Sequence, residues 1–197
     1  MALFDGERVL SETTWLAGRE HSTRLLVEVE FTLDRVGAQS YELTGLVVAR
    51  GPGSFTGVRV ALSVAKGMAS GLGIPAWGVS TLDAFALAAE PSSLPVRVLV
   101  EAGRGRYATG LYLDGVAVEV PRLATVQELT NSVTEPTVVV GEFHAGDREM
   151  LEANAFVRLA PKAACARRAG FVAELGWRLA QRGEPGNPSL LDALYLT

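Results

Sequence analysis

The residues whose types and spacing could support chemistry are concentrated in the loop Gly51–Gly57, which holds three glycines, a proline, a serine and a threonine. Leucine and valine dominate residues 44–50 before it and predict a strand buried on both faces. Apolar residues three or four apart from Val58 to Leu72 predict a helix after it. Backbone N–H groups at a helix start attract phosphate or carboxylate. The loop matches neither G-x-x-x-x-G-K-S/T nor G-x-G-x-x-G, so an anion-binding loop and a purely structural turn both stay open.

Other residues that could carry chemistry are few and are not spaced for it. The two histidines, His21 and His144, are not at metal-ligand spacing, and Cys165 is the single cysteine. Ser63 and Lys66 match the S-x-x-K pattern of acyl-serine enzymes, but the companion S-D-N and K-T-G motifs are missing. We therefore expect neither a metal site, nor a disulfide, nor acyl chemistry within this chain.

The segments around the glycine loop must position it, and their patterns predict an α/β protein. Turn signals and apolar runs predict strands at residues 2–4, 8–10, 44–50, 76–79, 97–101, 107–113, 116–120 and 137–140. Periodicity and capping boxes predict helices after His21–Ser22, from Val58, over 82–90, after Thr125, over 147–152 and over 163–182. A Pro-Ser-Ser-Leu-Pro segment at 91–95 predicts the boundary between two lobes, residues 1–91 and 92–197.

The predicted helix after His21–Ser22 has apolar residues on more than one face. One stripe contains Leu25, Leu26, Val29 and Leu33. Val27 and Phe31 lie off that stripe. A helix with two apolar faces can pack on its own sheet and still contact a partner, although a helix that is simply buried has the same pattern.

Composition excludes several classes of protein. The chain has 197 residues, 48% of them hydrophobic, and a formal charge of −4, which argues against a broad nucleic-acid surface. No apolar run is long enough to cross a membrane, and Met1–Asp5 does not begin a signal peptide, so we expect a cytoplasmic protein without a membrane partner. The arginines of the last helix predict a solvated face or contact with an acidic partner rather than with RNA.

Four segments carry a resemblance to a known family. The first is GPGSFTGVRVALSVAKGMASGLGIPAWGVSTLDAFA at residues 51–86, and the others are HSTRLL at 21–26, EAGRGRYATGLY at 101–112 and LDALYLT at 191–197. In this order they resemble the TsaB (YeaZ) family, the dimerisation subunit of the bacterial complex that makes threonylcarbamoyladenosine in tRNA. The resemblance spans nearly the whole chain.

The resemblance implies a fold and a role. The fold would be two ribonuclease-H-like lobes of the actin-like ATPase (ASKHA) type, with mixed sheets flanked by helices. The role would be a non-catalytic scaffold for TsaD, the catalytic paralogue whose His-x-x-x-His metal motif is absent here, in the modification of tRNAs that read ANN codons. The implied partners are TsaD, the ATPase TsaE, tRNA reached through the complex, and a second copy when the chain is alone. No cofactor is expected on this chain alone, and ATP or ADP would bind at the assembled interface.

The resemblance also suggests which residues act. The helix that begins at His21 contributes to subunit contacts in the family, so Leu25, Leu26 and Val29 are interface candidates, with burial in the chain's own core as the alternative. The residues that would shape the loop and the helix start, and are candidates for anion or nucleotide contact, are Gly51, Pro52, Gly53, Ser54, Phe55, Thr56 and Gly57. Arg59 and Lys66 are candidates for polar contact across the interface.

The sequence departs from the family at its beginning. Members usually start with an extra strand that ends in Asp-Thr, whereas ALFDGERVL at residues 2–10 resembles their second strand. We expect a downstream start or a truncation, and a sheet with unpaired backbone groups. The alternative function is an enzyme in its own right, peptidase-like (glycoprotease family) or nucleotide-hydrolysing. Against it, Asp83, Glu101 and Asp114 have ordinary roles as cap, strand-end and turn residues.

Overall fold

The computed structural model describes residues 1–15, 21–90 and 92–196, and the contacts divide them into two units. Unit 1 comprises the described part of Met1–Ser80 together with Arg167–Leu194, and unit 2 comprises Thr81–Ala166 with the end of the chain from Tyr195. This division differs from the lobes 1–91 and 92–197, because the helix after Ser80 joins unit 2 and the last helix returns to unit 1. Pro91, at the expected boundary, lies outside the described residues.

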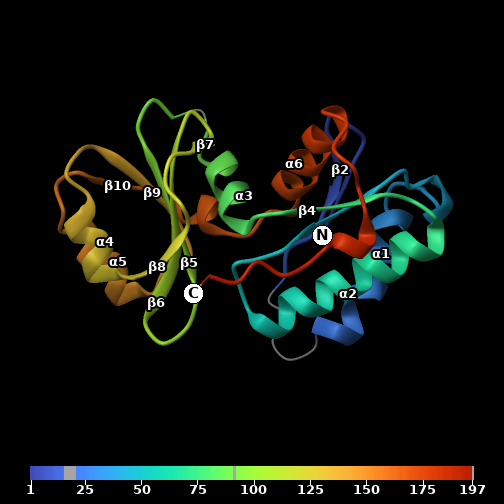
Figure 1. Ribbon diagram of the computed structural model, residues 1–197, viewed down its shortest axis with the longest axis horizontal. Helices are drawn as coiled ribbons and strands as arrows, with labels where there is room; N and C mark the ends of the chain where they lie inside the picture. Colours follow the sequence, from blue (N-terminus) through green and yellow to red (C-terminus); the bar gives the residue numbers. More distant parts are fainter. Residues whose placement is uncertain (16–20, 91, 197) are drawn as a thin grey trace. The chain divides into compact units, whose positions relative to one another are not determined.

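Unit 1 contains two separate two-stranded sheets in its described part (Figure 1). Its elements are β1 (Ala2–Phe4), β2 (Val9–Glu12), α1 (His21–Asp34), η1 (Ser40–Glu42), β3 (Leu46–Ala49), α2 (Phe55–Leu72), β4 (Ala76–Val79), α6 (Ala169–Gln181) and η3 (Pro188–Leu190). β1 pairs antiparallel with β2, and β3 pairs parallel with β4. Strand β3 is shorter than the predicted 44–50, and Val48 is its one buried residue, so the expected burial on both faces is wrong.

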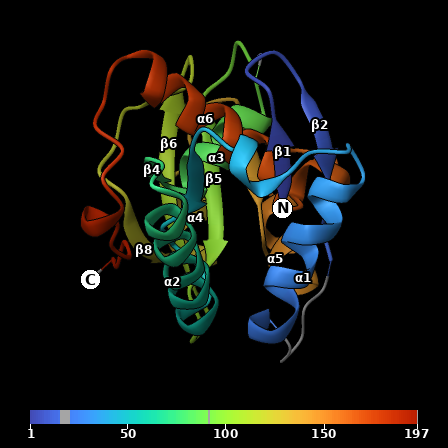
Figure 2. The same cartoon turned by 90° about the vertical axis from the view of Figure 1, so that its right-hand side faces the viewer.

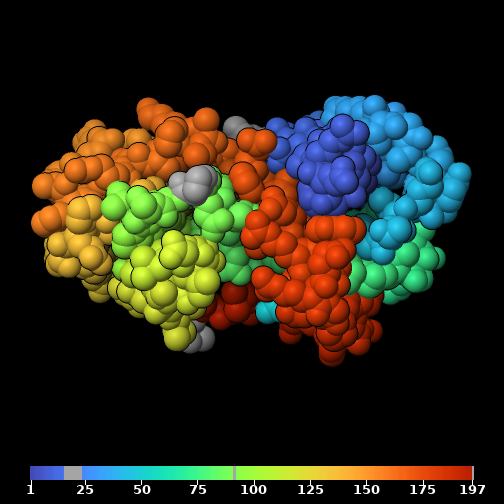
Figure 3. Space-filling model, turned by 90° about the horizontal axis from the view of Figure 1, so that it is seen from above, coloured from blue at the N-terminus to red at the C-terminus, as the bar shows by residue number. Residues whose placement is uncertain are grey.

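Helix α6 packs on both small sheets of unit 1. Its Trp177 ring meets Phe4 of β1 edge-on, with centroids 6.3 Å apart, and a Cβ on Gly176 would lie 2.1 Å from Val47 Cγ2 of β3. Figure 3 shows the β1–β2 segment, in dark blue, beside α6, in orange-red. Among the described residues β1 and β3 are each hydrogen-bonded to one other strand only.

The turn between β1 and β2 differs from the predicted two-residue hairpin at Asp5-Gly6. β2 begins at Val9, and four residues form the connection. The Asp5 carboxylate accepts hydrogen bonds from the N–H groups of Glu7 at 2.9 Å and Arg8 at 2.8 Å. An aspartate side chain that takes backbone donors in this way favours a wider turn over the two-residue one.

Unit 2 is built on one mixed sheet with helices on both faces (Figure 1). Its elements are α3 (Thr81–Ala88), β5 (Val96–Glu101), β6 (Arg106–Leu113), β7 (Val116–Ala117), β8 (Arg122–Thr125), α4 (Val126–Ser132), β9 (Thr137–Gly141), α5 (Ala145–Glu152), β10 (Val157–Leu159) and η2 (Lys162–Cys165). The strand order is β10-β9-β5-β6-β7, and β8 also pairs with β6. β5 runs parallel to β9 and antiparallel to β6, and alternate residues of β5 face a core with α3 and a core with α4 and α5.

The single helix predicted over 163–182 is wrong. The structure has the short η2, an extended segment through Arg168, and then α6 from Ala169. Cys165 therefore lies in a 3-10 turn, where it is half-buried against the core around α3. Helical periodicity continues through this region of the sequence, so only the contacts of Arg168, described below, mark the break.

No helix in the described ranges combines the length and the apolar character that a membrane span requires.

Gly176 offers a test of how closely α6 approaches β3. In Gly176→Ala the new Cβ would lie 2.1 Å from Val47 Cγ2 and 2.8 Å from Val47 Cβ, so the backbones must separate. We expect a loss of about 1–3 kcal/mol in the free energy of unfolding, measured by urea denaturation, despite the better helix propensity of alanine. The control is Gly67→Ala in α2, where a Cβ meets nothing within 4 Å and stability should rise by up to about 1 kcal/mol. Equal effects at the two sites would contradict this packing.

Candidate functional site

The glycine loop turns the chain sharply between β3 and α2. Gly51 has φ of 102°, in the region that favours glycine, and a Cβ there would meet the Leu194 carbonyl oxygen at 3.2 Å. The Ser54 hydroxyl accepts from the Gly57 N–H at 3.3 Å and caps α2. Helix α2 therefore begins at Phe55, three residues before the predicted Val58, and the last three residues of the predicted loop belong to its first turn.

One arginine lies against this loop. A Cβ on Gly53 would be 2.8 Å from Nη1 of Arg167, which comes from the segment before α6. Glycine at this position lets the guanidinium approach the backbone. The start of α2 thus has N–H groups and a cation side by side, an arrangement that suits an anion and equally stabilises the turn itself.

Arg59 and Phe55 form a stacked pair on the first turns of α2. Cζ of Arg59 lies 3.9 Å from the centroid of the Phe55 ring, and both side chains are exposed. Lys66, two turns further on, is half-buried. The Gly51–Gly57 loop leads into α2, and Arg59 and Lys66 lie on that helix. These candidates from the sequence are therefore close together along the chain.

Helix α1 turns a different face to the solvent from the one its sequence stripe predicted. Leu26, Val27 and Phe31 are 52%, 45% and 54% exposed, whereas Leu25 and Val29 are half-buried. Of the three interface candidates, only Leu26 therefore lies at the surface. The side chain of His21 lies outside the described residues.

The orientation of α1 has a cause that hydrophobic periodicity does not reveal. Glu28 and Thr32 are buried: the Thr32 hydroxyl donates to the Glu28 carbonyl at 2.7 Å, and Arg24 Nη2 lies 3.4 Å from Glu28 Oε1. Because these contacts provide hydrogen-bond partners for Glu28 and Thr32, the two residues can face the interior of unit 1. Val27 and Phe31, four residues apart, then share the outer face.

Helix α2 lies beside α1 (Figure 2). Ser63, Gly67, Ser70 and Gly71 are exposed. A Cβ on Gly67 or Gly71 would meet nothing within 4 Å, so no contact in the described structure requires glycine there. Each costs helix stability relative to alanine, which leaves the close approach of another molecule as a reason for it.

A cluster of polar side chains lies at one end of the unit 2 sheet. The Tyr107 hydroxyl donates to Asp147 and accepts from the His144 N–H at 3.3 Å, while His144 Nε2 lies 3.3 Å from Glu101 Oε1. Burial and the Asp147 carboxylate raise the pKa of Tyr107 to about 12, so the phenol keeps its proton. These contacts order the strand ends and leave no activated nucleophile.

The residues that an enzyme of this fold would use are not brought together. Asp83 accepts from the Tyr112 hydroxyl at 2.7 Å, and Asp114 occupies the turn between β6 and β7 at φ 47°. Within the described residues no side-chain hydrogen bond joins Ser63 to Lys66. Among the described residues, no three histidine, cysteine, aspartate or glutamate side chains lie together in a way that could hold a metal ion.

Comparison with known proteins places the chain in a family. A family model described as TsaD, tRNA N6-adenosine threonylcarbamoyltransferase, matches residues 15–121, more than half of the chain. The tRNA threonylcarbamoyladenosine biosynthesis protein TsaB of Bacillus subtilis is 30% identical over 159 residues, 77% of this chain and 69% of that protein. The chain belongs to the TsaB family. TsaB of Escherichia coli is 42% identical over 84 residues, 43% of this chain and 36% of that protein.

Solved structures agree with this membership. YeaZ from Pseudomonas aeruginosa superposes with a TM-score of 0.80 at 25% identity, covering 99% of this chain and 92% of that one. A second Pseudomonas aeruginosa structure, with similarity to peptidase YeaZ, gives a TM-score of 0.82 at 23% identity over 100% and 93% of the two chains, and shows the shared fold. The predicted mixed α/β architecture, of the actin-like kind found in TsaD, is thus confirmed.

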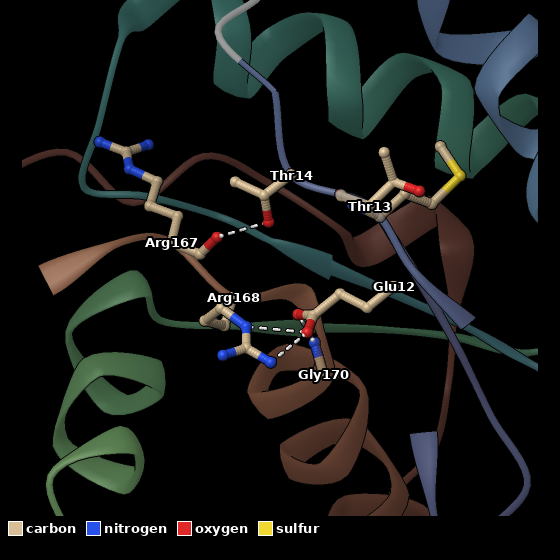
Figure 4. A network of polar contacts seen from close by, with 7 residues as sticks. Glu12, Thr13, Thr14, Arg167, Arg168 and Gly170 are labelled. Atoms are coloured by element: carbon tan, nitrogen blue, oxygen red, sulfur yellow. Dashed lines mark hydrogen bonds and ion pairs between the residues drawn. The ribbon is translucent and has the colours of Figure 1, made fainter. Parts of the chain in front are cut away.

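In this TsaB-family chain, Glu12 ties the β1–β2 segment to the start of α6 (Figure 4). Its carboxylate accepts from Arg168 Nε at 2.8 Å, Arg168 Nη2 at 2.5 Å and the Gly170 N–H at 2.9 Å. It caps α6, since Arg168 at the N-cap supplies no side-chain cap of its own. Next to it, the Thr14 hydroxyl donates to the Arg167 carbonyl at 3.4 Å. These contacts hold the arginine that borders the glycine loop.

The Glu12 contacts predict a pH dependence. Burial by itself would raise the pKa of Glu12, but hydrogen bonds from Arg168 and Gly170 outweigh it and hold the pKa below the usual 4.5. The ionised carboxylate therefore stabilises the fold above about pH 4.5, and this contribution is lost as the pH falls through the folded-state pKa.

Glu12→Gln should lower the free energy of unfolding by about 1–3 kcal/mol at pH 7, measured by urea denaturation. The difference from the unsubstituted protein should shrink below about pH 4.5. Glu174→Gln, in an exposed pair with Arg178 at 2.6 Å, is the control and should change stability by less than about 1 kcal/mol. A Glu12→Gln effect that stays constant down to pH 3 would exclude the ionised carboxylate as its source.

Proposed function

We propose that this chain is a non-catalytic subunit that binds a TsaD-type transferase through α1 and α2 and so supports the making of threonylcarbamoyladenosine in tRNA. The names of the relatives supply the pathway, since the Bacillus subtilis and Escherichia coli proteins are both called tRNA threonylcarbamoyladenosine biosynthesis proteins. The site geometry supports a binding role, because its functional candidates are surface residues of two helices.

The exposed face of α1 is the observation that carries the proposal. Leu26, Val27 and Phe31 are each about half exposed on one helix whose inner face is already packed. Contiguous apolar side chains exposed on one surface are a feature of protein contact sites. A large aromatic side chain such as Phe31 is the type that contributes most to affinity when it enters a partner's pocket.

The face of α2 next to it fits a helical partner. Arg59, Ser63, Gly67 and Gly71 follow each other at intervals of four residues and form one ridge. With glycine at two of these positions, a second helix can approach α2 closely. Arg59 and Lys66 lie beside the small residues, where charged groups form the rim of an interface and choose between partners.

The remaining partners would bind either to the same surface or to the assembled complex. A second copy of the chain would use it when the transferase is absent, and the ATPase TsaE and tRNA would join through the assembled cytoplasmic complex. We place any ATP or ADP at the assembled interface, with the Gly51–Gly57 loop as the candidate contact, and no cofactor on this chain alone. An independent peptidase or nucleotide hydrolase is the alternative.

Phe31→Glu tests the docking face. Placing a carboxylate in an apolar interface should weaken binding to the transferase by about 100-fold or more, equivalent to about 3 kcal/mol, measured by isothermal titration of the two purified proteins. Val120→Glu is the control, because Val120 is 86% exposed in unit 2 and its substitution should leave binding unchanged.

Gly67→Leu separates docking from folding. Its side chain points into open space in the isolated chain, so thermal stability should be unaffected or slightly raised, while docking should be weakened about tenfold or more. Transferase binding that survives both Phe31→Glu and Gly67→Leu would overturn the proposed surface. Hydrolysis of peptide or ATP by the purified chain, abolished by Ser54→Ala or Ser63→Ala, would overturn the non-catalytic role.

A further inference from the structure

The loop between β5 and β6 has a backbone that is unusual for the residue at its centre. Gly103, Arg104 and Gly105 have φ of 76°, 56° and 68°, three left-handed residues in succession. Glycine adopts this conformation freely, but the Cβ of an arginine makes it unfavourable. Among the described residues the only other non-glycine with positive φ is Asp114, a residue type common in such turns. The turn itself thus gives no reason for an arginine at position 104.

The loop also leaves backbone donors available. Ala102 N–H donates to the Arg106 carbonyl at 2.9 Å and Arg106 N–H donates to the Gly103 carbonyl at 3.1 Å, which closes the turn. The N–H groups of Arg104 and Gly105 make no hydrogen bond in the described structure. Successive N–H groups in a turn can form the kind of backbone concavity that binds anions.

Two cations accompany these donors. Arg104 and Arg106 are exposed, as is every residue from Glu101 to Arg106, and neither makes a hydrogen bond or ion pair with a described residue through its side chain. The carboxylates of the neighbouring elements have other partners: Glu101 with His144 at 3.3 Å, Asp147 with Tyr107, and Glu128 with the Thr125 N–H at 2.7 Å. The two guanidinium groups are therefore available to a ligand from outside.

We infer that the loop Gly103–Arg106 contacts a backbone phosphate of the RNA that the assembled complex modifies, an inference that rests on the proposed function. A phosphodiester oxygen accepts hydrogen bonds from amide N–H and guanidinium groups together, and arginine can bind it with two donors at once. The loop protrudes at the lower end of β5 and β6 in Figure 1, and all its residues are exposed, which suits a strand of phosphates passing over it. Such a contact positions RNA without reading its sequence.

The salt dependence of RNA binding tests the inference. The complex of this chain with its transferase is titrated with fluorescently labelled tRNA between 50 and 200 mM salt, with either the unsubstituted chain or Arg104→Gly/Arg106→Ala. Glycine at 104 keeps the left-handed turn, so the fold is preserved. Removing one phosphate contact should reduce the slope of log affinity against log salt by about 0.7–0.9. Arg148→Ala/Arg178→Ala is the control that removes the same two charges, because Arg148 already pairs with Glu152 and Arg178 with Glu174.

The outcomes are distinct. An unchanged slope and affinity in the double variant would overturn the inference. So would loss of transferase binding at an unchanged slope, because the loop would then contact an acidic protein surface instead. Transferase binding is measured before any RNA is added. A failure of the unsubstituted chain to bind the transferase would therefore show separately that the proposed function, and the inference with it, is wrong.

Discussion

Unit 1 depends on the packing of α6 across two sheets that share no hydrogen bonds in the described structure. Two-stranded sheets are marginally stable by themselves, so β1–β2 and β3–β4 each need this helix. Gly176 allows close contact with β3, Trp177 meets β1, and the Glu12 carboxylate fixes the first turn of the helix. A residue near the beginning of the chain thereby positions a helix near its end.

The contacts that hold α6 in place also position residues of the candidate site. The segment that Glu12 orders includes Arg167, whose guanidinium borders Gly53 at the start of α2. The glycine loop, α2 and α1 are therefore supported by the same packing of α6 that holds unit 1 together. A docking surface benefits from such support, because helices that are already ordered lose little conformational entropy when a partner binds.

The polar clusters inside unit 2 differ from the groups that the described residues expose at the surface. The polar clusters of unit 2 are paired internally, with the Tyr107 phenol held protonated between Asp147 and His144. The exposed groups described above are apolar on α1 and cationic on the β5–β6 loop, and both kinds of group can contact a partner. The family model that matches residues 15–121 is described as the transferase TsaD, so this TsaB-family chain shares that part of its fold with a transferase.

The order of the main strands and helices, the glycine loop, the Thr125 capping box and the family can all be predicted from the amino-acid sequence, because these depend on local patterns. It did not determine where the last helix begins or how α1 is turned. Arg168 leaves helical geometry to meet Glu12, 156 residues away, and the inward Glu28 and Thr32 turn α1 so that Leu26 faces outward while Leu25 and Val29 are half-buried. Both outcomes result from satisfying polar groups across the fold, and only tertiary structure brings those partners together.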